Sequence, residues 1–147
     1  MHEEIVAATP EVEEDENEAI EVVTPATYYL KNGKHYIVYE EVVEGTSGVI
    51  KNRIKINGDE CVEIVKSGLS NSHMIFEKNK KNQTFYKTPY GQMLIGVNTR
   101  HLQVDFEEDK IAVQIDYELD VNHEPMADCK IRMNIVSKDS GKFSVLS

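Results

Sequence analysis

The chain has 147 residues, of which 40% are hydrophobic and 29% charged, and its formal net charge is -10 at pH 7. This size and composition suit one folded domain with its own core and exclude wholesale disorder. The acidic excess argues against nucleic acid and anionic membranes as partners, because both draw their affinity from lysine and arginine. We therefore expect residues 1–147 to form a single domain with no nucleic-acid and no membrane partner.

The beginning of the chain, MHEEIVAATPEVEED, is acidic where a secretory signal would be basic, and no long apolar run follows it. A membrane-spanning helix needs about 20 apolar residues, and the sequence contains no such stretch. The two cysteines, Cys61 and Cys129, are too few for a disulfide scaffold. These features predict a cytoplasmic protein.

The acidic run at residues 13–18 (EEDENE) lies between two segments that favour β-strands, residues 3–12 and 19–30. We predict a hairpin with the acidic run at its tip. Pro25 cannot donate a hydrogen bond to a neighbouring strand, so the second strand is expected to bend or bulge there.

Asn32-Gly33 predicts a type I′ turn, because both central residues of such a turn need a positive φ angle. Further turn residues divide the following region into short strands that alternate apolar and polar side chains. We expect these strands to pair with their chain neighbours as an antiparallel meander, over residues 27–31, 35–43, 49–56, 61–66, 73–77 and 84–88.

The apolar positions between residues 93 and 106 are first odd-numbered and then even-numbered, with the change near residues 99–101. One extra residue at that point predicts a β-bulge that curves the sheet. Residues 110–121 and 129–135 then alternate with a period of two, which is typical of strands with one face in the core. Closing about 8–10 such strands into an up-and-down barrel would remove the exposed edges, and a two-sheet sandwich is the alternative.

Several segments, KHYIVYEE, NRIKINGDECVEIVKSG, SHMIFEKN, TFYKTPYGQMLIGVNT and KIAVQIDYEL, together resemble the YwiB-like family of uncharacterised bacterial proteins. The resemblance covers nearly the whole chain. It implies a closed antiparallel calycin-like (lipocalin-like) barrel and brings no known activity. Lys66 departs from the family pattern, since relatives tend to carry arginine there, and lysine offers a point charge in place of a two-pronged donor.

No catalytic or metal-binding pattern is present in the sequence. The five histidines lack metal-ligand spacing, the serines at 67, 70 and 72 lack the G-x-S-x-G context, and no phosphate-binding loop occurs. Glu40 and Glu41 are adjacent in a predicted strand, so they point to opposite faces and cannot act as a carboxylate pair. We expect a protein that is not an enzyme and needs no cofactor and no metal.

The one basic cluster, Lys78, Lys80 and Lys81, lies at a predicted hairpin tip. In a protein this acidic, we favour a solvated tip over a nucleic-acid patch.

Three polar residues fall in phase with apolar inner positions: Asn52, Thr99 and Tyr117. A buried polar group without a partner costs about 1–3 kcal/mol, so each must find a hydrogen bond in the core or from a ligand. Satisfied core hydrogen bonds are the simpler interpretation. The functional interpretation makes these residues the polar lining of an otherwise apolar pocket.

The leading hypothesis for function is a non-catalytic module that binds a small apolar or amphipathic ligand inside the barrel. The alternative is a packed barrel that acts through its surface, as a protein-interaction module or a homodimer. Candidates for that surface are the aromatic residues around the turn at residues 88–91, namely Phe85, Tyr86 and Tyr90.

Overall fold

The computed structural model describes residues 2–15, 18–21, 24–69, 71–88 and 90–137, and this part of the chain contains strands and turns and no helix. The strands are β1 (His2–Asp15), β2 (Glu18–Glu21), β3 (Thr24–Lys31), β4 (Lys34–Val42), β5 (Val49–Asn57), β6 (Cys61–Gly68), β7 (Ser72–Glu77), β8 (Lys81–Thr88), β9 (Gly91–Phe106), β10 (Lys110–Val121) and β11 (Glu124–Ser137). Within these residues there is accordingly no helix of the length and hydrophobicity needed to cross a membrane.

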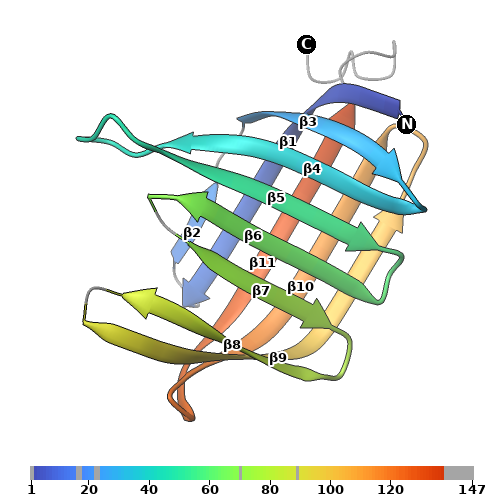
Figure 1. Ribbon diagram of the computed structural model, residues 1–147. Helices are drawn as coiled ribbons and strands as arrows, with labels where there is room; N and C mark the ends of the chain where they lie inside the picture. The colour runs from blue at the N-terminus through green and yellow to red at the C-terminus, as the bar shows by residue number, and fades with distance from the viewer. Residues whose placement is uncertain (1, 16–17, 22–23, 70, 89, 138–147) are drawn as a thin grey trace.

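All strand pairings are antiparallel and form one continuous ladder, in the order β7-β6-β5-β4-β3-β1-β11-β10-β9-β8. The ladder is strongly curved, so that β3 to β7 cross in front of β9, β10 and β11 in Figure 1. The described residues form eleven strands, one more than the predicted range, because β2 is a separate short strand that pairs only with β1.

The predicted hairpins near the beginning of the chain are present. Asp15 pairs with Glu18 in the acidic hairpin, while residues 16 and 17 at its tip lie outside the described residues. Pro25 lies within β3 opposite Ala7, and the register of β3 against β1 runs through this position without a bulge. Residues 22 and 23, between β2 and β3, lie outside the described residues. Asn32 and Gly33 have φ angles of 54° and 77°, which confirms the type I′ conformation.

The predicted bulge in β9 is confirmed at Arg100. Thr99 pairs with Tyr117 and His101 pairs with Asp116, so Arg100 is the extra residue. The bulge keeps both Thr99 and Leu102 in the core although they are three positions apart. It also directs the Arg100 side chain to the outer face, where it contacts Glu118.

The inner face of the curved sheet holds the hydrophobic core. Phe76 of β7 meets Tyr117 of β10 edge to face, with ring centroids 4.9 Å apart, so the two layers touch through their side chains. The predicted inner positions of β10 and β11 are confirmed as buried, among them Ile115, Ile131 and Met133. The fully buried apolar side chains of the core are Phe76, Ile37, Ile54, Ile56, Leu102, Ile115, Val62 and Val97.

β7 and β8 are chain neighbours that lie at opposite ends of the ladder. Their connecting turn is held from both sides, since the Thr99 amide of β9 donates to the Lys80 carbonyl at 3.1 Å and the Lys78 amide donates to the Glu60 carbonyl, between β5 and β6, at 3.2 Å. Among the strand pairings of the described residues, none joins β7 to β8. The antiparallel all-β fold is thus confirmed, and the closed barrel stays a prediction.

Candidate functional site

A polar cluster lies on the inner face at the end of the curved sheet where β4 and β6 end and β5 begins. It consists of Glu41 from β4, Asn52 from β5 and Lys66 from β6. Each residue stands an even number of positions from buried apolar residues of its own strand, such as Ile37, Ile54 and Val62. Strand alternation therefore carries all three side chains to the inner face.

Glu41 holds the cluster together. Nδ2 of Asn52 donates to Oε1 of Glu41 at 2.6 Å, and Nζ of Lys66 donates to the same oxygen at 3.2 Å. Asn52 and Lys66 are directly opposite each other on β5 and β6, so the strand register brings their side chains to one place. Both bonds are charge-assisted, which makes them stronger than bonds between neutral groups.

The cluster runs from the core to solvent. Asn52 is completely buried, whereas the side chains of Glu41 and Lys66 are 39% and 38% exposed. Oδ1 of Asn52 is buried without a hydrogen-bond partner. A buried acceptor left in this state costs about 1–3 kcal/mol, so a donor from outside the described residues would stabilise it.

Tyr39 extends the cluster toward the core. It lies opposite Asn52 on β4 and is 9% exposed. Burial, and to a lesser extent the negative charge of Glu41, raises the pKa of the Tyr39 hydroxyl to about 12. The hydroxyl is therefore protonated at neutral pH and can donate a hydrogen bond.

The structure brings Thr99 and Tyr117 together as direct partners on β9 and β10 and places Asn52 elsewhere in the ladder, on β5. All three are buried, as their phase with the apolar positions predicts. Oγ1 of Thr99 has no hydrogen-bond partner, and Nδ2 of Asn82 on neighbouring β8 is also buried without one. That Asn52, Thr99 and Tyr117 line a ligand stays a prediction.

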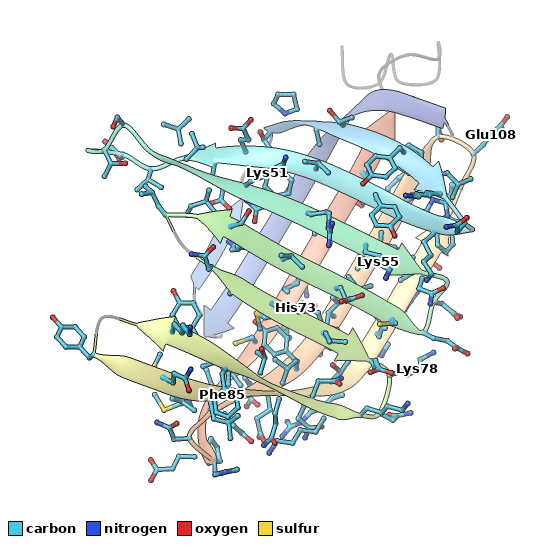
Figure 2. All side chains as sticks on the ribbon, viewed as in Figure 1. Lys51, Lys55, His73, Lys78, Phe85 and Glu108 are labelled. Atoms are coloured by element: carbon cyan, nitrogen blue, oxygen red, sulfur yellow. The ribbon has the colours of Figure 1, made fainter. Side chains whose placement is uncertain are left out.

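The aromatic surface candidates do not form one patch. Phe85 is 68% exposed and Tyr90 is 98% exposed, whereas Tyr86 is only partly exposed and lies on the opposite face of β8 from Phe85. Figure 2 shows Phe85 on β8. Their role in an interface stays a prediction.

The basic cluster is partly neutralised by acidic neighbours. Lys80 pairs with Glu77 at 3.4 Å, and Lys81 pairs with the buried carboxylate of Asp120. Lys78 is exposed at the same turn, where Figure 2 shows it, and forms no ion pair with another of the described residues.

The outer face of the sheet carries other polar side chains, and the sheet separates them from the inner cluster. His73 contacts Glu63 at 2.7 Å, and Lys55 contacts the same carboxylate at 3.3 Å, with His73 and Lys55 both visible on the front layer in Figure 2.

Two shallow hollows of about 260 and 140 Å³ lie along β9 to β11 and are lined mainly by polar residues. Among the described residues, no group of three His, Cys, Asp or Glu side chains converges as a metal site requires.

Alternation along β5 predicts Asn52 as a polar inner residue but does not reveal Glu41 as its partner. Glu41 is in phase with Ile37 and Tyr39, so alternation already places it on the inner face. The expectation that Glu40 and Glu41 point to opposite faces is confirmed, since Glu40 is exposed and Glu41 bonds to Asn52. The contact between Glu41 and Asn52 could not be predicted because it depends on the register of β4 against β5, which the turn between these strands sets.

An antiparallel sheet curved around an apolar core, with a polar cluster at one end of its inner face, places the protein in the all-β class. The family model described as "Domain of unknown function (DUF1934)" matches residues 5–133, and the chain belongs to this family.

The chain is 31% identical over 114 residues to the "Uncharacterized beta-barrel protein YwiB" of Bacillus subtilis (strain 168), a match that covers 77% of this chain and 78% of that protein. Its fold is similar to the crystal structure of the ywiB protein from Bacillus subtilis, with a TM-score of 0.76, 23% identity, and coverage of 92% of this chain and 93% of that chain. The resemblance to the YwiB-like family is thereby confirmed.

Proposed function

We propose that the protein is a non-catalytic module that binds a small amphipathic molecule inside a closed, calycin-like barrel. The apolar part of the ligand packs against the inner face, and its polar part reaches the cluster of Glu41, Asn52 and Lys66. A mostly apolar pocket with a few placed polar groups is the usual form of a small-molecule site.

The observation that carries this proposal is the state of Asn52. Its side chain is completely buried, it is held by Glu41 through Nδ2, and its Oδ1 has no partner. An asparagine that served only the core would have both ends of its amide satisfied. An amide held at one end and free at the other is suited to orient a ligand.

The surroundings of the cluster support an apolar entrance. Val42 and Leu69 are exposed at the same end of the sheet, 79% and 56% respectively, and the Leu69 amide donates to the Val49 carbonyl where β5 begins. Closure of the barrel is supported by the short turn that joins β7 to β8, the two end strands of the ladder, and by the contact between Phe76 and Tyr117. The name of the YwiB relative also describes a β-barrel.

Native mass spectrometry of the protein purified from its own host tests this function. We expect extra mass that is released on denaturation and that is lost in Asn52→Leu. The matched control is Asn134→Leu, an asparagine on the exposed face of β11, which should keep the extra mass. A wild-type mass equal to that of the bare chain, together with no binding of added amphiphiles, would contradict the proposal.

The second candidate function is a protein-interaction or homodimeric module, and the exposure of Phe85 and Tyr90 favours it. Large exposed aromatic side chains are typical anchors of protein interfaces. Light scattering on the purified protein tests this alternative: a doubled mass that Phe85→Ser with Tyr90→Ser returns to the monomer value supports it, and a monomer at all concentrations contradicts the homodimer.

A further inference from the structure

We infer that the polar end of the ligand is a hydrogen-bond donor, a hydroxyl or a protonated amine, and is not a carboxylate. This inference rests on the proposed function and concerns the same site. It follows from which atoms of Glu41, Asn52 and Lys66 are satisfied and which are not.

The unsatisfied buried atom of the cluster is an acceptor. Oδ1 of Asn52 has no partner, while Nδ2 of the same amide is used by Glu41. Oε1 of Glu41 accepts both bonds of the cluster, and Oε2 accepts none from the described residues. An amide oxygen and an ionised carboxylate can only accept, so a ligand that satisfies them must donate.

The charges of the cluster lead to the same conclusion. Glu41 and Lys66 neutralise each other at 3.2 Å. A ligand carboxylate near Oδ1 of Asn52 would place acceptor against acceptor and would add a second negative charge beside Glu41. The single positive charge of Lys66 would then be shared between two carboxylates, which leaves the cluster with a net negative charge.

A hydroxyl meets no such conflict, and an ammonium group, although it adds a positive charge near Lys66, places donors against the acceptors that are left without partners. A hydroxyl can donate to Oδ1 of Asn52 and accept from Nζ of Lys66, which has further N–H groups and is partly exposed. An ammonium group can donate to Oδ1 of Asn52 and to Oε2 of Glu41 together. Half-buried apolar residues beside the cluster, Ile64 and Met74, offer contacts for an attached apolar chain.

The experiment compares decanol, decylamine and decanoate, which share one apolar chain and differ in their polar end, by displacement of a fluorescent apolar probe at neutral pH. We expect decanol and decylamine to bind at least about tenfold more tightly than decanoate. Glu41→Gln should weaken decylamine by about tenfold and change decanol far less, because the substitution removes a charge that only the amine uses. Glu40→Gln, on the outer face of the same strand, is the matched control and should change neither affinity.

The outcomes separate the two claims. Decanoate binding as tightly as decanol and decylamine would overturn the donor inference and leave the binding function standing. Failure of all three compounds and of the probe itself to bind would overturn the proposed function as well. Equal weakening of decanol and decylamine by Glu41→Gln would contradict direct contact between the amine and Glu41. The comparison of three compounds on the wild-type protein does not depend on how any variant folds.

Discussion

The ammonium group of Lys81 pairs with the carboxylate of Asp120 over the backbone of Gly96, although the two residues are 39 positions apart. Asp120 is 5% exposed, and a Cβ atom at position 96 would come within 3.1 Å of the Lys81 side chain and 3.2 Å of the Asp120 side chain. The glycine therefore provides the space in which the pair lies. The pair ties β8, the end strand of the ladder, to β10 across β9.

Replacing Lys81 with methionine should lower the free energy of unfolding by about 2–3 kcal/mol, because it leaves a buried carboxylate without its cation. The partial exposure of Lys81 keeps the loss below that of a fully buried pair. Urea denaturation measures the effect. Lys80→Met is the control, since its pair with Glu77 is exposed and contributes less than about 1 kcal/mol. Equal losses in the two variants would show that the Asp120 pair has no special role.

The raised pKa of the Tyr39 hydroxyl predicts a loss of stability at alkaline pH. Its pKa is about 12 in the folded chain against an ordinary value of 10.0, chiefly because it is buried. As the pH rises through 10, the unfolded chain releases the proton first, so the stabilisation present below pH 10 is lost between about pH 10 and 12. We expect the stability difference between wild type and Tyr39→Phe to fall by about 1.3 kcal/mol from about pH 9 to about pH 11. If the difference in stability between wild type and Tyr39→Phe does not change with pH, the Tyr39 hydroxyl is in solvent.

Ile115 tests the assignment of the inner face. It is completely buried on β10, so Ile115→Ala should lower the free energy of unfolding by about 2–5 kcal/mol. Gln114→Ala changes the next residue, whose side chain is on the outer face, and should cost less than about 1 kcal/mol. Thermal or urea denaturation measures both. A larger loss for Gln114→Ala would mean that the inner and outer faces have been exchanged.

Gly33→Ala isolates the cost of a positive φ angle. The backbone at Gly33 has a φ of +77°, and nothing lies within 4 Å of where a Cβ would be, so the substitution introduces strain without a clash. We expect a loss of about 1–2 kcal/mol. Asn32→Gly, at the other central position of the turn, should change stability by less than about 1 kcal/mol. An alanine variant as stable as wild type would mean that the turn adopts another conformation.

Asn52→Leu should leave the protein as stable as wild type or more stable by about 1 kcal/mol, because it removes a buried acceptor that has no partner. Glu41 loses one donor, but it is partly exposed and solvent can replace that bond. A stabilised variant that no longer binds ligand is the expected signature of a residue kept for function. A loss above about 2 kcal/mol would show that Asn52 serves the core.

Much of the fold follows from local pattern. The period of two in residues 110–121 predicts the buried face of β10, and the change of phase near residues 99–101 predicts the bulge that the structure places at Arg100. Both predictions are confirmed because alternation and a bulge can each be recognised from the order of consecutive residues. The turn predicted at Asn32-Gly33 is confirmed for the same reason.

The contacts of the candidate site were harder to predict, because they depend on register between strands. Asn52 meets Lys66 only because the turn between β5 and β6 sets their pairing, and no local pattern states which residues will face each other. The pair of Lys81 and Asp120 depends on two such registers and on Gly96 between them. Sequence analysis could therefore find Asn52 as an unusual inner residue and could not find its partners.

The pairing of β1 with β11 has a consequence for how the protein is made. Val6 pairs early with Ala26 of β3, but its partner on the other side is Ser137, so on the ribosome the edge of β1 that faces β11 stays unpaired until all the other strands have been synthesised. The contacts within β3 to β7 and within β8 to β11 are local and can form early, whereas joining these halves through β1 requires closing a very long loop. Joining the halves is therefore the expected slow step of folding, and a nascent chain stalled before β11 is the form most exposed to aggregation.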